Sequence, residues 1–144
     1  MGQRDFTHWQ ANYSVGDWVL NNQHKDLLDL CRQVIECAPS PDQDTPSQFD
    51  SIREELLEAV EMHFLTEENL LRYCGYTGLS AHMADHRESL TMLTDYLRPN
   101  SDFAGLNQDL LRDFLRQWWL HHVLESDLKF AGATQRTLPR RNKA

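Results

Sequence analysis

Two short stretches decide the fold: HFLTE at residues 63–67 and HMADH at residues 82–86. The first and last positions of each stretch are possible metal ligands, four residues apart. Residues at i and i+4 lie one above the other on a helix face, so each stretch presents two ligands in one direction. The sequence GYTG at 75–78 is typical of a turn. The pattern therefore predicts two antiparallel helices that face each other across a metal site.

The composition is that of a single globular domain. The chain has 144 residues, of which 40% are hydrophobic and 25% charged, with a net charge of −8. An acidic chain is poorly suited to nucleic acid, whose phosphates bind basic surfaces. No apolar run approaches the ~18 residues of a membrane span, and the N-terminus lacks a signal peptide's apolar core. We therefore expect a cytoplasmic protein with reduced thiols at its three cysteines, Cys31, Cys37 and Cys74.

Outside the two stretches, apolar residues recur every three or four positions in four segments. The first segment begins near Trp18, and a capping sequence at Thr45 opens the second. The third begins near Leu79, and the fourth ends around Ala131-Gly132. The fold predicted is all-α, an up-down-up-down antiparallel four-helix bundle of residues 18–132. A non-helical N-terminal arm, 1–17, would pack on the bundle, and 133–144 would form a polar basic tail or linker.

Every predicted helix carries at least one histidine among its core positions. A single histidine on an apolar face is usually an ordinary core residue, but five of them with two carboxylates are costly to bury without a cation. Their number exceeds what one ion needs. Zinc prefers four ligands, so the mixture of nitrogen and oxygen ligands favours a pair of irons. The candidate ligands are His24, His63, Glu67, His82, His86, His122 and Asp127.

The spacing of the last two ligands does not fit a regular α-helix. His122 and Asp127 are five residues apart, which separates them by roughly 140° around an α-helix. For both to reach one centre, the backbone must widen locally, as a single π-type turn would do. If it does not widen, Asp127 is a solvated residue near the helix end.

These residues together resemble the hemerythrin family, specifically the bacterial hemerythrins. The resemblance covers roughly residues 9–131, and all seven ligand positions are filled in order. Two positions depart from the usual pattern, with Asn21 where bacterial relatives have Asp and Trp119 where the family has Leu. The matching motifs are YSVG at 13–16, NNQHK at 21–25, HFxxEE at 63–68, HxxxH at 82–86 and WxxxHxxxxD at 118–127.

The resemblance implies a division of the imidazole ligands between two irons. His82, His86 and His122 would hold one iron, which would be six-coordinate and closed. His24 and His63 would hold the other, which would keep one position open.

The resemblance also implies how O2 binds. Glu67 and Asp127 would bridge the irons together with an oxo or hydroxo group, and O2 would bind reversibly at the open iron as hydroperoxide. No side chain would act as a catalytic acid or base, so we expect a carrier and not an enzyme. The apolar wall of the O2 pocket would be formed by Leu27, Trp118, Trp119 and Val123.

Three functions remain open at this point. The first is O2 storage, delivery or scavenging by a monomer, with azide and nitric oxide as other possible ligands. The second is an O2-sensing or redox-sensing module of a larger signalling chain, which the basic tail would suit. The third is a di-iron enzyme that reduces O2, peroxide or nitric oxide. No partner among nucleic acids or membranes is expected.

Overall fold

A computed structural model describes residues 5–38, 46–98 and 108–137. Within those ranges every regular element is helical. The elements are η1 (Ala11–Tyr13), α1 (Trp18–Glu36), α2 (Pro46–Cys74), α3 (Leu79–Tyr96), α4 (Gln108–Gln117), η2 (Trp118–Leu124) and α5 (Glu125–Thr137).

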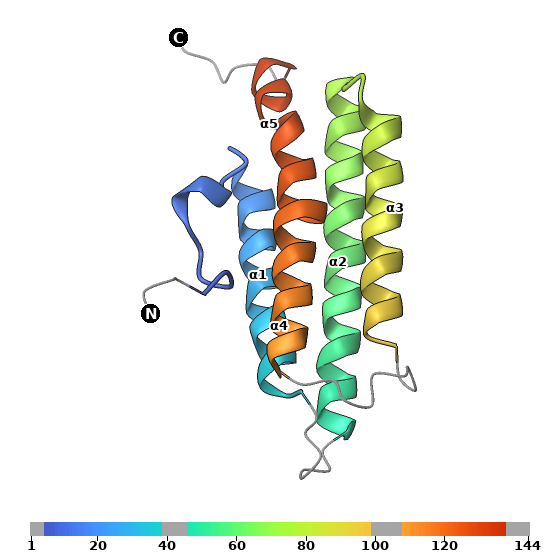
Figure 1. Ribbon diagram of the computed structural model, residues 1–144. Helices are drawn as coiled ribbons and strands as arrows, with labels where there is room; N and C mark the ends of the chain where they lie inside the picture. Colours follow the sequence, from blue (N-terminus) through green and yellow to red (C-terminus); the bar gives the residue numbers. More distant parts are fainter. Residues whose placement is uncertain (1–4, 39–45, 99–107, 138–144) are drawn as a thin grey trace.

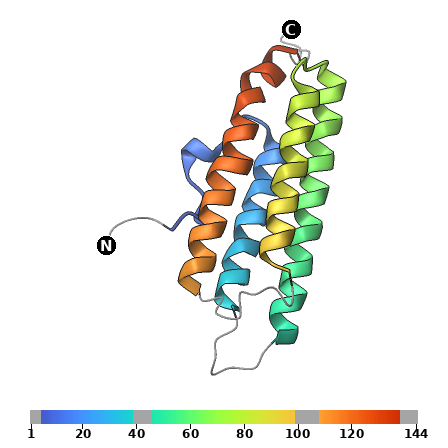
Figure 2. The same cartoon turned by 45° about the vertical axis from the view of Figure 1, so that its right-hand side comes forward.

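The helices form four rods packed side by side, seen from two directions in Figures 1 and 2. The fourth rod is the uninterrupted run of α4, η2 and α5. α1 contacts α2, α2 contacts α3, and the fourth rod returns to contact both α3 and α1. Successive rods run in opposite directions, so the predicted antiparallel four-helix bundle is confirmed.

The ends of the helices follow local sequence signals. Asp17 precedes α1, and its side chain accepts a hydrogen bond from the Leu20 amide at 2.9 Å. Gly75 has a φ of 69° after α2. The Gly75 amide donates to the Arg72 carbonyl and the Tyr76 amide to the Leu71 carbonyl, which is a Schellman ending. The predicted cap at Thr45 lies outside the described residues.

The fourth rod differs from the prediction at its end. α5 continues to Thr137, whereas the sequence predicted an end around Ala131-Gly132. A glycine inside a helix costs about 1 kcal/mol relative to alanine but does not by itself end the helix. The predicted π-type widening is present, because η2 is a π-helix from Trp118 to Leu124.

The apolar core is divided by a layer of buried polar side chains. On α1, His24 lies between the buried residues Leu20 and Leu27. On α2, Glu67 lies between the larger apolar cluster around Val60 and a smaller one that contains Leu71. The same division on two neighbouring helices places the polar layer across the inside of the bundle.

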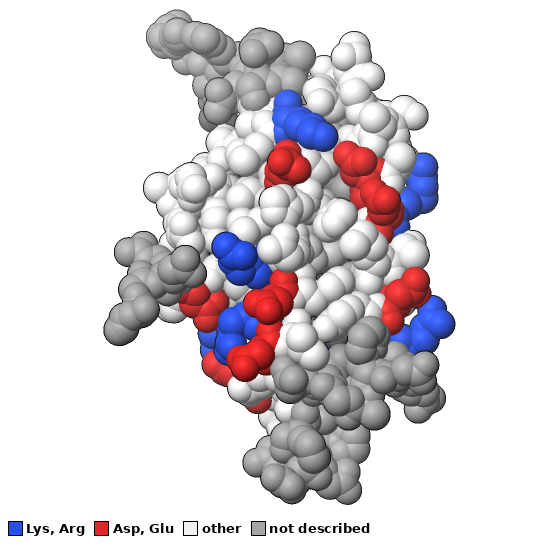
Figure 3. Space-filling model, in the orientation of Figure 1, with Lys and Arg blue, Asp and Glu red and all other residues white. Residues whose placement is uncertain are grey.

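The surface differs from the interior in having many charges of both signs. On the face shown in Figure 3, lysines and arginines lie in small groups beside aspartates and glutamates. This mixture is unlike the continuous basic surface that phosphate binding requires. In the described part of the chain, no helix has the length and apolar character needed to cross a membrane.

The segment before α1 packs against the bundle through aromatic side chains. Tyr13 is buried, and its hydroxyl donates to the Phe6 carbonyl at 2.9 Å. Its ring contacts Trp9 and Trp119 edge-on, with centroids 5.7 and 5.3 Å apart. Asn21 joins this segment to α1, since its side-chain oxygen accepts from the Val15 amide at 2.9 Å. The arm therefore covers the side of the bundle where Trp119 lies.

Tyr13→Ala should lower the free energy of unfolding by about 3–5 kcal/mol, because it removes a buried aromatic ring. Tyr13→Phe should cost only about 1 kcal/mol, the net value of one hydrogen bond. Urea denaturation of the metal-free proteins measures both changes. A loss below about 1 kcal/mol for the alanine variant would show that the arm is not packed as described.

Candidate metal centre

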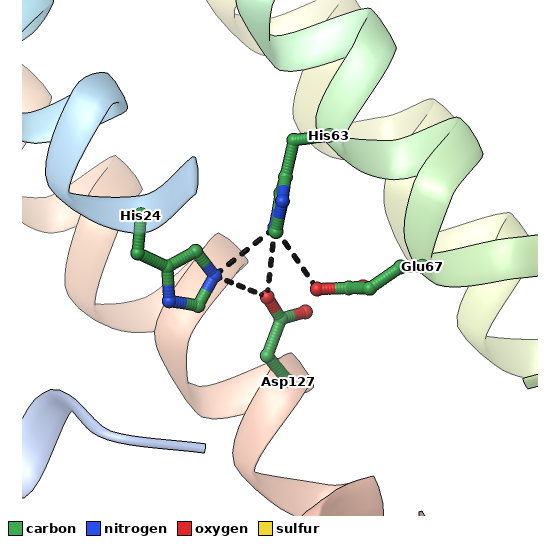
Figure 4. Close-up of side chains that lie close together, drawn as sticks. All are labelled: His24, His63, Glu67 and Asp127. Carbon is green, nitrogen blue, oxygen red and sulfur yellow. Dashed lines mark hydrogen bonds and ion pairs between the residues drawn. The ribbon is translucent and has the colours of Figure 1, made fainter. Parts of the chain in front are cut away.

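Six of the seven predicted ligands meet inside the bundle. They come from every rod, and none is more than 4% exposed. Figure 4 shows four of them pointing toward one another from three rods. The six are His24 on α1, His63 and Glu67 on α2, His82 and His86 on α3, and Asp127 on α5.

The six residues form two overlapping groups of four. The first group adds His24 and His63 to the two carboxylates, and the second adds His82 and His86 to the same carboxylates. In each group the potential ligand atoms lie within 4.8 Å of one another. Because both carboxylates belong to both groups, the arrangement suits two metal ions with shared carboxylate ligands.

The imidazoles approach the carboxylates through their Nε2 atoms. His82 and His86 each place Nε2 2.8 Å from Oε1 of Glu67. On the other side, His24 Nε2 lies 2.8 Å from Asp127 Oδ2. His63 Nε2 is 2.9 Å from Glu67 Oε2. All four rings thus direct the same nitrogen toward the centre.

The outer nitrogen of His63 carries a proton. Its Nδ1 lies 2.8 Å from Oε1 of Gln23, an oxygen that can only accept. The orientation of the Gln23 amide is fixed by Thr66, whose hydroxyl donates to the Met62 carbonyl and accepts from Gln23 Nε2. A neutral imidazole protonated at Nδ1 has a bare Nε2, so His63 presents a lone pair to the centre.

His86 and His82 are held in the same tautomer. His86 Nδ1 donates to Oε2 of Glu68 at 2.7 Å. The Ser126 hydroxyl donates to Asp85 Oδ2 at 3.3 Å and must therefore accept from His82 Nδ1, 3.2 Å away. These protons on the outer side leave the inner nitrogens free, which is how metal-binding histidines are usually held.

This placement of protons makes the centre unfavourable without a cation. The bare Nε2 atoms of His63, His82 and His86 lie 2.8–2.9 Å from oxygens of Glu67. Oε2 of Glu67 and Oδ1 of Asp127 are buried and have no hydrogen-bond partner in the part of the chain that the structure describes. Buried, unpaired acceptors of this kind are costly, and metal ions between the nitrogens and the oxygens would satisfy both.

Burial sets the protonation of the centre. It raises the pKa of Glu67 well above the usual value, and the nearby charge of Asp127 adds to the effect. Burial opposes ionisation of Asp127 too, but its side-chain contacts with Glu67, His24 and His63 outweigh it and hold its pKa well below the usual value. Burial and the adjacent His86 lower the pKa of His82 to about 4. The ring of His82 is therefore neutral at pH 7 and able to bind metal.

The seventh predicted ligand, His122, is not in either group. It is partly exposed, and its carbonyl accepts a hydrogen bond from the Ser89 hydroxyl at 2.8 Å. His122 is one of the residues that line a polar cavity of about 150 Å³ between α3 and the fourth rod. The other residues that line this cavity are Asp85, Glu88, Ser89, His121, Ser126 and Lys129. A ligand role for His122 stays a prediction.

The four residues expected around the O2 pocket are all buried in one apolar cluster, as Leu27, Trp118, Trp119 and Val123. Trp119 contacts His24 edge-on, with ring centroids 4.9 Å apart. Trp118 instead donates from its indole nitrogen to the Ser89 carbonyl at 2.9 Å. Trp119, which stands where the family usually has leucine, thus lies directly against His24 of the first group.

The sequence did not reveal the residues behind the ligands. Glu68 contacts the outer nitrogen of His86. Gln23 and Ser126 each serve a histidine on another helix. Their only sequence signal is that each adjoins a predicted ligand, and this does not show where the side chain points.

Acidification should destabilise the metal-loaded protein more steeply than the metal-free protein. Metal-bound imidazoles stay unprotonated, whereas histidines of the unfolded chain take up protons near pH ~6.5. Below that pH the unfolded chain binds more protons than the loaded protein, so the free energy of unfolding falls. In the metal-free protein, the lowered pKa values of His63, His82 and His86 act in the same direction. The raised pKa of Glu67 opposes them, because the folded protein keeps a proton that the unfolded chain releases.

Melting temperatures between about pH 7 and pH 4, with and without bound metal, measure the two slopes. Equal slopes would contradict the assignment of these histidines as ligands.

Comparison with known proteins agrees with this geometry. Residues 15–133 match the family described as "Hemerythrin HHE cation binding domain". Myohemerythrin of Sipunculus nudus is 29% identical over 124 residues, which are 86% of this chain and 90% of the relative. Bacteriohemerythrin of Methylococcus capsulatus is 28% identical over 118 residues, 81% of this chain and 87% of the relative.

Among solved structures, wild-type hemerythrin superposes with a TM-score of 0.72 at 25% identity, covering 88% of this chain and 95% of that one. The chain belongs to the hemerythrin family, whose cofactor is a pair of iron ions, and its two overlapping ligand groups are suited to hold that pair.

Proposed function

We propose that this protein is a carrier that binds O2 reversibly at a pair of irons. The observation that supports this most strongly is the convergence of four imidazole Nε2 atoms on two shared carboxylates inside the buried core. The irons would supply the two electrons that O2 takes up on binding. The protein would hold the irons, exclude water and leave one position open. The proposed ligands are His24, His63, Glu67, His82, His86, His122 and Asp127.

The open position is proposed to lie beside His24 and His63. This half has two imidazoles, whereas the other half would have three if the His122 ring turned from the polar cavity toward Glu67. The backbone of His122 lies in the π-helix η2, which brings residues five apart closer to one face than an α-helix does. The apolar side chains of Leu27, Trp119 and Val123 would keep water from the open position.

Reconstitution with ferrous iron under anaerobic conditions tests this function. We expect two irons per chain, and O2 should produce oxo-to-iron charge-transfer bands that revert when O2 is removed. His122→Ala should lower the iron content, whereas the neighbouring exposed His121→Ala should not. Far fewer than two irons in the folded wild type would contradict the proposal. A spectrum that never reverts would argue against reversible binding.

Trp119→Leu tests the proposed pocket. The indole is fully buried against His24, so the smaller side chain should open space beside the proposed O2 position. Azide binding to the oxidised protein should become several-fold faster, and the O2 adduct should have a shorter lifetime because water enters. The cavity should cost about 1–3 kcal/mol of stability.

Trp18→Leu is the control, since it makes the same substitution at an indole that is 77% exposed. Stopped-flow azide binding compares the two variants with wild type. Equal rates in all three proteins would show that Trp119 does not limit access.

A further inference from the structure

The four inner histidines differ in what lies behind their outer nitrogens. His86 has a carboxylate, Glu68, in direct contact. His82 has the Ser126 hydroxyl, which leads to the carboxylate of Asp85. His63 has a neutral amide from Gln23, and Nδ1 of the fully buried His24 has no hydrogen-bond partner. The carboxylate support is therefore confined to the α3 half of the centre.

The contact between His86 and Glu68 is the shortest of these. Nδ1 and Oε2 are 2.7 Å apart, and the Glu68 side chain is only 17% exposed. Partial burial reduces the screening that weakens ion pairs and charge-assisted hydrogen bonds at open surfaces. A carboxylate in this position pulls the Nδ1 proton and makes the opposite nitrogen a stronger ligand.

The outer nitrogen of His82 is also linked to a carboxylate, but only through a hydroxyl group. Ser126 is 4% exposed, and its hydroxyl links the ring to Asp85. Asp85 lines the polar cavity of about 150 Å³, which has room for water, so its charge is partly solvated. We therefore rank this support below that of Glu68.

In the His24/His63 half, no described carboxylate contacts the outer nitrogen of either ring. Gln23 accepts the proton of His63 but is uncharged, and Thr66 fixes its amide in that orientation. His24 contacts Trp119 edge-on, and its Nδ1 has no hydrogen-bond partner among the described residues. Glu67 and Asp127 serve both halves, so they do not distinguish them. The difference in ligand strength comes from the residues behind the rings.

We infer that the centre takes up metal in a set order, with the first ion entering the His82/His86 half and the second the His24/His63 half. This inference rests on the proposed function only in that two ions bind. The carboxylate of Glu68 is the main cause of the order, and Ser126 with Asp85 contributes. In this role Glu68 is a positioning residue, because it acts on the metal through His86.

Zinc is a suitable probe, because each half offers four ligands and zinc accepts four. Zinc is added stepwise to the metal-free full chain, and its affinities are measured by chelator competition. Nitrogen-15 spectra of the imidazole rings identify the half that fills first. In wild type, the first equivalent should shift Nε2 of His82 and His86, and only the second should shift those of His24 and His63.

Glu68→Gln separates charge from structure, because the amide oxygen can still accept from His86 Nδ1. It should weaken the first zinc site about 10–100-fold, the usual effect of losing an outer partner, and leave the second nearly unchanged. Glu61→Gln is the control, since it removes one charge from an exposed position of the same helix. The reciprocal variant Gln23→Glu should strengthen the second site and reduce the difference between the two.

Three outcomes would overturn the inference. The first zinc equivalent could shift the rings of His24 and His63, or all four rings equally. Alternatively, Glu68→Gln could behave like Glu61→Gln, which would mean that a third histidine and not the carboxylate sets the order. Binding of fewer than two zinc ions by wild type is a different result, because it would contradict the paired-metal site itself.

Discussion

The structure depends on where the protons of the buried histidines lie. An imidazole at neutral pH has one proton, and a partner on one nitrogen determines that the other is bare. Gln23, Glu68 and Ser126 hold the protons of His63, His86 and His82 on the outer side. The inner nitrogens then face the oxygens of Glu67 and Asp127. Nitrogen lone pairs that face carboxylate oxygens at these distances need a cation between them, which is the proton of Glu67 in the metal-free protein and would be metal in the loaded one. The outer hydrogen bonds therefore prepare the inner nitrogens for metal.

The bundle makes this arrangement possible because it places the polar layer between two apolar clusters. Burial lowers the pKa values of His63, His82 and His86, which favours their neutral form, and it raises the pKa of Glu67. The same burial would make the layer a large cost if it stayed uncompensated. The stability of the apolar core therefore holds the predicted ligands in place. Metal that binds the folded protein would offset part of the free-energy cost of burying the polar layer.

The sequence predicted what local spacing determines. The i and i+4 pairs at 63–67 and 82–86, the turn at Gly75 and the widening before Asp127 all depend on a few adjacent residues. Interactions between helices could not be predicted from local residue spacing. Nothing in the spacing shows that Gln23 on α1 reaches His63 on α2. The predicted end of the fourth helix, around Ala131-Gly132, was wrong because the helix passes this glycine and continues to Thr137.

His122 shows why a motif and a geometry can give different information. The motif places it five residues before Asp127, and the π-helix has the pitch that such a pair requires. Yet His122 lies outside both ligand groups and lines the polar cavity, and its backbone carbonyl accepts a hydrogen bond from Ser89. The hydrogen bond from Ser89 holds the main chain at His122. Its proposed ligand role would therefore depend on the torsions of its side chain.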